Sequence, residues 1–227
     1  RDRLRSRGLG DVYKRQSVDN AEWTQRLRYN AEEIRTRVDF TQIPDIMKEA
    51  MISIEDKRFY EHHGVDWKRT LGAVYGMATG NDTAGGSTIT QQLIKNNIFS
   101  AESENGLVDT FKRKFQEQYL ALILEQSVDK DTILQNYLNT INLGNNNLGV
   151  QAAAQNYFNK DVSELTISES AVIAATTSNP YKYNPVRFPE NNKTRRAIVL
   201  KNMLDQELIS KAEYDEALAD NVYDRIM

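Results

Sequence analysis

Glu55 and Asp56 are the side chains whose place in the sequence most favours chemistry. They end a run of apolar residues with the i, i+3, i+4 spacing of a buried helix face: Ile46, Met47, Ala50, Met51 and Ile54. A carboxylate at the end of a buried helix, with Phe59 and Tyr60 beside it, is well placed for a general base because burial raises the pKa of an acid. A surface carboxylate followed by a turn with two histidines would give the same pattern, and this stretch alone favours that simpler interpretation.

The stretch Thr83–Phe99, TAGGSTITQQLIKNNIF, predicts a helix that begins just after two glycines. Either Ser87 or Thr88 can cap this helix, whose first exposed amides favour an anion. Helical spacing places a hydroxyl, two amides and an ammonium on one polar face: Thr88, Gln92, Lys95 and Asn96. This face suits sugar hydroxyls and phosphate oxygens, although a solvated helix face would have the same composition. It is not a Walker loop, because Lys95 lies far beyond the glycines.

The stretch Phe111–Gln126, FKRKFQEQYLALILEQ, carries a third polar cluster. Arg113, Lys114 and Glu117 share one side of the predicted helix, and apolar residues occupy nearly all of the rest. We therefore expect the helix to be buried, and its charges to need either partners or a ligand. Ala121, one turn beyond Glu117, would leave space for such a ligand. The alternative is an i, i+4 ion pair between Arg113 and Glu117, which is worth little when exposed.

The elements that must position these residues are helices. Pro44 and Asp45 open the helix that leads to Glu55, and Asp66 caps a helix with an apolar stripe over Trp67–Ala78. Further helices are expected over Lys130–Ile141, Val150–Phe158, the capping box Thr166/Glu169 through Ala175, Arg195–Leu204, and the capping box Ser210/Glu213 onward. An extended stretch is expected near Val38–Ile43. At least eight helices without a convincing hairpin predict a mostly α fold.

The composition excludes several classes of protein. The 227 residues, 40% hydrophobic and 27% charged, allow one good-sized globular domain or two small ones. A formal net charge of −3 gives no general attraction to nucleic acid, and the absence of cysteine excludes disulfides and thiolate metal sites. There is no run of about 18 apolar residues that would form a membrane span. Arg1–Gln16, with six basic residues, resembles a translated adaptor sequence and is left out of the fold prediction.

Together these stretches resemble the peptidoglycan glycosyltransferase domain, glycosyltransferase family 51, of class A penicillin-binding proteins and monofunctional glycosyltransferases. IEDKRFYEHHG is similar to the family's first motif, GGSTITQQLIKN to the second and RKFQE to the third. KDTILQNYLNTINLG and LTISESAVIAATTSNPYKYNP are similar to the fourth and fifth. The resemblance covers roughly residues 35–220 and implies a mostly α fold, with a lysozyme-like lobe and a smaller membrane-facing jaw. Residues 17–34 would be a linker or stem, and residues 221–227 a truncated linker toward a transpeptidase domain.

The resemblance also implies an activity: polymerisation of lipid II into β-1,4-linked glycan with inversion and release of undecaprenyl pyrophosphate. Its two catalytic residues would be Glu55, as general base, and Glu117, which would align the cations or hold Mg²⁺ (or Mn²⁺) against the pyrophosphate. Residues implied to bind the substrate or support its site are Asp56, His62, Ser87, Thr88, Gln92, Lys95, Asn96, Arg113 and Lys114. Zinc binding by His62 is not expected, because no second ligand set is visible.

The implied location is the outer face of the cell membrane, with an N-terminal transmembrane anchor upstream of this chain. The implied partners are lipid II, the growing lipid-linked glycan, the membrane surface, an appended transpeptidase domain and the cell wall synthesis machinery, but not nucleic acid. Asn142 departs from the pattern, because the family often has an aromatic residue there. Two alternatives remain. One is a lysozyme-like hydrolase or lytic transglycosylase with Glu55 as acid and Glu117 as its partner, and the other is a non-catalytic module that binds a lipid pyrophosphate.

Overall fold

The structure is a computed structural model that describes residues 37–79, 85–99 and 107–227. Residues 1–36, which include the expected adaptor segment and stem, lie outside the described part. The described residues form nine α-helices, two short 3-10 helices and two isolated β-bridges, without a named strand. The mostly α fold class is therefore confirmed. None of the described helices is both long and apolar enough to cross a bilayer.

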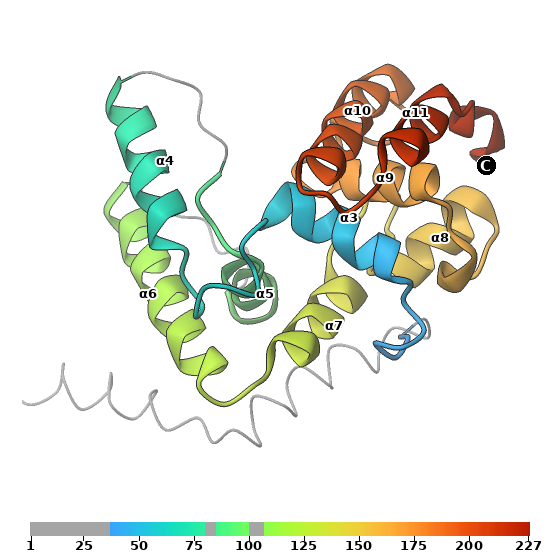
Figure 1. Cartoon of the computed structure of the whole chain (residues 1–227). Coiled ribbons are helices and arrows are strands. Elements are labelled where there is room, and N and C mark those ends of the chain that lie inside the picture. Colours follow the sequence, from blue (N-terminus) through green and yellow to red (C-terminus); the bar gives the residue numbers. More distant parts are fainter. Residues whose placement is uncertain (1–36, 80–84, 100–106) are drawn as a thin grey trace, which may run out of the picture.

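The larger lobe is built around α9 (Ile167–Thr176), whose residues from Ser168 to Thr176 are all buried. α3 (Asp45–Glu55) and α10 (Pro189–Asp205) pack on α9 and on each other. α8 (Val150–Phe158) and α11 (Lys211–Ala219) complete this lobe (Figure 1). Both predicted capping boxes are present, at the starts of α9 and α11. Proline at the first position of α10 starts that helix six residues before the predicted Arg195.

The smaller lobe consists of α4 (Trp67–Thr79), α5 (Ile89–Ile98) and α6 (Leu107–Glu125). α5 packs on α6 and also on α7 (Lys130–Thr140), which connects the lobe to α8 (Figure 1). Of the two expected caps, Ser87 and Thr88, it is Thr88 that caps α5, because its hydroxyl and the Gln91 side chain form a capping box.

The prediction of a buried α6 is wrong on one side. Phe111 and Phe115 are 70% and 73% exposed, and Tyr119 and Ile123 continue the same i, i+4 stripe at 41% and 38%. Its other side, with Glu117 and Ala121, is buried. The predicted stripe on α4 also faces outward, since Trp67, Leu71 and Tyr75 are 55%, 67% and 71% exposed. The smaller lobe therefore presents apolar side chains to its surroundings, which single soluble domains rarely do over large areas.

The space expected beside Ala121 is filled by Gly64. Gly64 has φ +81°, and a Cβ atom built on it would lie 2.5 Å from the carbonyl oxygen of Ala121. The loop after α3 thus packs against the backbone of α6, and no ligand can occupy that position.

Two terminal segments differ from the predictions. The stretch expected to be extended contains a turn at residues 40–42, and Val38 bonds through its amide and carbonyl to the side chain of Asn139. The segment 221–227, expected to be a linker, packs on the larger lobe. Val222 is fully buried, and the Arg225 guanidinium pairs with Asp220 and Glu169.

Candidate active site

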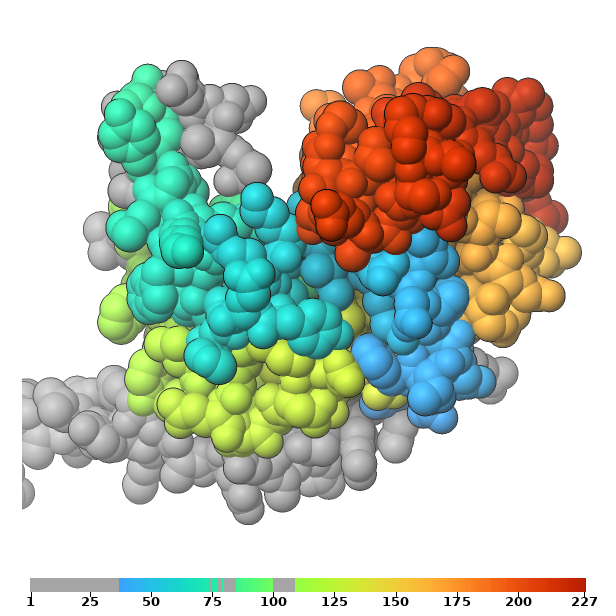
Figure 2. All heavy atoms as spheres, in the orientation of Figure 1, coloured from blue at the N-terminus to red at the C-terminus, as the bar shows by residue number. Residues whose placement is uncertain are grey.

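A cleft of about 710 Å³ runs between the two lobes (Figure 2). Its walls come from the end of α3, from α5 and α6 of the smaller lobe, and from the loop after α9 together with α10. Seven of the residues proposed from the sequence line it: Glu55, Ser87, Gln92, Lys95, Asn96, Lys114 and Glu117. The fold therefore brings the candidate base and two of the three candidate cations, Lys95 and Lys114, to one cavity, although these residues come from three helices. Arg113 does not line it.

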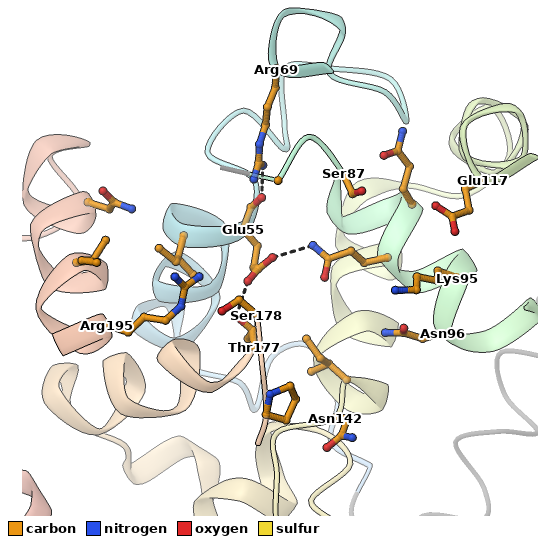
Figure 3. Close-up of a pocket in the computed structure, with 18 of the residues that line it drawn as sticks. Glu55, Arg69, Ser87, Lys95, Asn96, Glu117, Asn142, Thr177, Ser178 and Arg195 are labelled. Atoms are coloured by element: carbon orange, nitrogen blue, oxygen red, sulfur yellow. Dashed lines mark hydrogen bonds between the residues drawn. The ribbon is translucent and has the colours of Figure 1, made fainter. Parts of the chain in front are cut away.

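Glu55 is the last residue of α3 and is 8% exposed. Its Oε2 accepts a hydrogen bond of 2.8 Å from Gln92 Nε2, and its Oε1 accepts one from the Thr177 hydroxyl (Figure 3). The backbone oxygen of Glu55 accepts from Arg69 Nη1. Both carboxylate oxygens are thus anchored by neutral donors, which fixes the direction in which the group can accept a proton.

The amide of Gln92 has a defined orientation because Tyr137 holds its other end. The Tyr137 hydroxyl lies 3.3 Å from Gln92 Oε1. Burial, followed by the nearby carboxylates of Glu55 and Asp56, raises the pKa of Tyr137 well above its usual value. The phenol therefore stays protonated and donates to Gln92 Oε1, so that Gln92 Nε2 must point at Glu55.

The cationic side of the cleft is organised around Glu117, which is 1% exposed on α6. Lys114 Nζ lies 2.7 Å from Glu117 Oε2 and 3.3 Å from Ser87 Oγ, and Arg113 Nη1 bonds Glu117 Oε1. Lys114 remains 41% exposed and lines the cleft, as does the exposed Lys95. The buried carboxylate therefore holds two cations in place, and this arrangement gives an anion in the cleft fixed positive charge.

The same contacts bear on a metal ion at Glu117. Both of its oxygens already accept hydrogen bonds from cations. Within the described residues, no group of three or more acidic or histidine side chains could hold a metal ion. Mg²⁺ is usually bound by one or two carboxylates together with water and substrate phosphate, and the donors here do not suit a metal held by the protein alone. Dependence on Mg²⁺ or Mn²⁺ stays a prediction.

Besides Arg113, three of the predicted site residues do not line the cleft: Asp56, His62 and Thr88. They therefore support the site instead of contacting a substrate. Asp56 is almost fully buried, and its Oδ2 accepts from His62 Nε2 at 2.9 Å and from the amide of Ile89 at 3.0 Å. The Thr88 hydroxyl donates to the carbonyl of Gly64 at 2.7 Å and caps α5. These bonds tie the loop after Glu55 to the start of α5, because buried polar groups must find partners.

The chain of polar contacts continues from His62 through Lys130 to Glu125. His62 Nδ1 lies 3.5 Å from Lys130 Nζ, which also contacts Glu125 Oε2 at 2.7 Å. An ammonium can only donate, so Nδ1 is an acceptor and Nε2 carries the proton given to Asp56. The Thr90 hydroxyl bonds the other oxygen of Glu125. One network therefore joins the end of α3 to α5, α6 and α7.

Comparison with known proteins decides the family of this chain. A family model described as Transglycosylase matches residues 20–204. The chain belongs to the transglycosylase family. Its resemblance to family 51 glycosyltransferases is thereby confirmed.

Relatives of this transglycosylase chain are considerably longer proteins. Penicillin-binding protein 1A of Neisseria lactamica is 43% identical over 191 residues, 82% of this chain and 23% of that protein. Penicillin-binding protein 1F of Bacillus subtilis is 46% identical over 182 residues, 80% of this chain and 25% of that protein. The crystal structure of penicillin-binding protein 1A from Haemophilus influenzae gives a TM-score of 0.48 at 28% identity, covering 81% of this chain and 17% of that one. The chain spans about a quarter of the length of the curated relatives it matches.

Sequence analysis of the transglycosylase chain missed two direct partners of Glu55. Thr177 lies 122 positions and Arg69 lies 14 positions further along the chain, and their local sequence gave no sign of a contact with Glu55. Arg195 of α10 also lines the cleft without having been predicted. Asn142, the departure from the family pattern, lines the cleft with its Oδ1 bonded to the amide of Gly144 at 2.9 Å.

Proposed function

We propose that this domain polymerises lipid II into β-1,4-linked glycan strands with inversion at the anomeric carbon and release of undecaprenyl pyrophosphate. The single observation that carries the proposal is the shared cleft. A buried carboxylate, Glu55, and two cations, Lys95 and Lys114, line the same cavity from different helices. A base opposite fixed positive charge suits transfer of a sugar from a pyrophosphate to a hydroxyl.

In the proposed step Glu55 accepts the proton of the 4-hydroxyl on the N-acetylglucosamine of the acceptor lipid II. That oxygen forms a bond to C1 of the N-acetylmuramic acid at the end of the growing chain. The bond from C1 to the phosphate oxygen breaks, and its electron pair leaves with undecaprenyl pyrophosphate. Attack opposite to the leaving group inverts C1. The leaving group needs positive charge and not a proton, so one carboxylate is sufficient.

The remaining cleft residues take supporting roles in this proposal. Lys114 and Lys95 stabilise the charge that develops on the pyrophosphate. Arg113 does not line the cleft and contributes through its bond to Glu117. Ser87, Gln92 and Asn96 orient phosphate or sugar groups. Glu117 keeps the two cations of α6 at a fixed separation through its buried oxygens. Any Mg²⁺ in the reaction is then expected on the substrate pyrophosphate.

The exposed stripes of α4 and α6 fit a lipid-linked substrate. We place the smaller lobe against the membrane surface, where Phe111, Phe115 and Leu71 would bury apolar area that is exposed in the free chain. Lipid II and the growing glycan both have their lipid tails in that membrane. The corresponding location is the outer face of the cell membrane, where cell wall is made. Since the relatives are about four times as long and are named for penicillin binding, we also propose a transpeptidase domain in the parent protein.

Polymerisation of labelled lipid II in detergent, with and without Mg²⁺, tests the proposed activity. The unmodified chain should form glycan polymer, whereas Glu55→Gln should form none and should retain its thermal stability. Polymerisation by Glu55→Gln at a normal rate would remove Glu55 from the role of base. Soluble muropeptides released from purified cell wall would instead indicate a hydrolase, and binding of lipid II without product would indicate a binding module.

A further inference from the structure

The Thr177 hydroxyl stands between two acceptors. Its Oγ1 contacts Oε1 of Glu55 (Figure 3). The same Oγ1 lies 2.9 Å from the carbonyl oxygen of Ala174. A threonine hydroxyl has one hydrogen and two lone pairs, so it can donate to only one of these oxygens at a time. The second oxygen is close enough to accept that hydrogen whenever the first one stops accepting it.

The protonation state of Glu55 decides which acceptor is used. An ionised carboxylate has no hydrogen, so Thr177 donates to Glu55 Oε1. Once Glu55 carries a proton, that proton can be donated from Oε1 to Thr177 Oγ1, and the threonine hydrogen turns to the Ala174 carbonyl. Only hydrogens move, because the three oxygens are already in contact.

Gln92, the other partner of Glu55, cannot make this exchange. Its Nε2 carries only donors, and its Oε1 is directed at the Tyr137 hydroxyl. Gln92 can therefore only donate to Glu55, and it does so at Oε2 whether or not Oε1 carries a proton. Thr177 differs because a hydroxyl can both donate and accept.

The position of Thr177 is fixed by the core. It is the C-cap residue of α9, with φ −56° and ψ −46°, and it directly follows the buried residue Thr176. Its own amide also bonds the carbonyl of Ala174, at 3.3 Å. The hydroxyl is thus presented to Glu55 from the end of a helix whose residues Ser168–Thr176 are all buried.

We propose that Thr177 is a positioning residue that keeps Glu55 hydrogen-bonded both before and after it takes the proton of the acceptor hydroxyl. This inference rests on the proposed function. The acceptor O–H bond breaks, Glu55 binds that proton and later gives it to water, and Thr177 exchanges its donor partner without a net gain or loss of hydrogen. The charge-assisted bond to the carboxylate is the stronger of the two, so its net effect favours ionised Glu55.

The test compares Thr177→Val, which keeps the shape and removes the hydroxyl, with Thr177→Ser, which keeps the hydroxyl. In Thr177→Val we expect kcat for lipid II polymerisation to fall about 10-fold and the acid limb of its pH profile to move up by about 1 pH unit. KM should change by less than about twofold, because the substrate contacts stay in place. Thr177→Ser should restore both kcat and the acid limb.

Thr176→Val is the matched control. This change removes the hydroxyl of the preceding residue, which bonds the carbonyl of Val172 at 3.2 Å and does not contact Glu55. The acid limb of the pH profile of Thr176→Val should therefore match that of the unmodified chain. Thr177→Ala, which also lacks the hydroxyl, must reproduce the shift if Thr177→Val does not fold. An unshifted acid limb in folded Thr177→Val or Thr177→Ala, or a failure of Thr177→Ser to restore activity, would overturn the inference. Normal polymerisation by Glu55→Gln would instead overturn the proposed function.

Discussion

Gln92 Nε2 lies 2.8 Å from Glu55 Oε2, although the two residues are 37 positions apart in the chain. This bond joins α5 of the smaller lobe to the end of α3 in the larger lobe across the wall of the cleft. It gives the base a neutral donor whose direction is set from behind by Tyr137. The alignment of the base therefore depends on how the two lobes pack.

The first prediction concerns Gln92. Gln92→Leu removes the donor, so we expect kcat to fall about 10-fold. Gln92→Glu places a second carboxylate beside Glu55, which disfavours ionisation of the pair and should move the acid limb of the pH profile upward. The pH dependence of lipid II polymerisation measures both effects. A Gln92→Glu variant with the profile of the unmodified chain would show that the bond does not influence the base.

The second prediction concerns the cations of α6. Lys114→Met should lower kcat about 100-fold, because it removes a charge that stabilises the leaving pyrophosphate. Its thermal stability should change little, because the buried Glu117 keeps its bond to Arg113 and the Lys114 side chain is 41% exposed. Lys112→Met, two residues earlier on the exposed side of α6, is the control and should keep activity within about twofold. If Lys114→Met unfolds the chain and spares the turnover of the folded fraction, the ion pair with Glu117 is structural.

The third prediction concerns the contact between Gly64 and Ala121. Gly64→Ala should destabilise the fold by about 2–4 kcal/mol, because φ is +81° and the added Cβ would lie 2.5 Å from a backbone oxygen. Gly72→Ala is the matched control. Apart from the backbone of α4 itself, no atom of the described residues lies within 4 Å of a Cβ at Gly72, so this change should stabilise the helix by about 0.5–1 kcal/mol. Urea denaturation compares the two, and equal stability would contradict the close approach.

The fourth prediction concerns acid stability of the C-terminal segment. The bidentate hydrogen bond from Arg225 lowers the pKa of Asp220. Burial raises the pKa of Glu169, but the Thr166 amide, Lys160 and Arg225 outweigh it, and the net pKa is lowered. An acid whose pKa is lower in the folded state than in the unfolded state stabilises the fold at pH values above its unfolded-state pKa, which is about 4 for these groups. That stabilisation is lost as the pH falls through the folded-state pKa.

Arg225→Met should therefore lower the melting temperature at pH 7 more than at pH 3, and the melting temperature of the variant should depend less on pH over this range. Lys211→Met removes an exposed pair with Asp215 and serves as the control, with little change at either pH. A uniform loss across the range would assign Arg225 a packing role alone.

The fifth prediction concerns the exposed stripe of α6. The double change Phe111→Ser and Phe115→Ser should weaken sedimentation with phosphatidylglycerol–phosphatidylethanolamine vesicles by at least about 10-fold, because each buried aromatic contributes about 1.5–3 kcal/mol. Leu218→Ser, an exposed apolar residue on α11 of the larger lobe, should have no effect. Unchanged sedimentation of the double variant would place the membrane contact elsewhere.

Local patterns in the sequence predicted most of the helices and their starts. The capping residues Thr88, Thr166 and Ser210 each bond the backbone three residues on, and this signal can be recognised without the fold. The apolar period on α6 was also recognised, but period alone does not say which side packs. Phe115 faces outward because the polar side with Glu117 packs inward instead.

Contacts between distant elements could not be predicted. The bond of Thr177 to Glu55 and the contact of Lys130 with His62 join residues separated by 122 and 68 positions. No local pattern marks such pairs, because they depend on how α7 and α9 dock against α3. The packing of Val222 could not be predicted either, because a segment as short as 221–227 is not long enough to show a hydrophobic period.

The contact between Gly64 and Ala121 sets a dimension of the cleft. Gly64 follows the base by nine positions, and Ala121 stands two turns beyond the Lys114 cation on α6. Because these two residues meet through peptide groups, the span from base to cation does not vary with the rotamers of intervening side chains. The spacing between the reacting sugar and the departing phosphate would then depend on a contact between main-chain atoms.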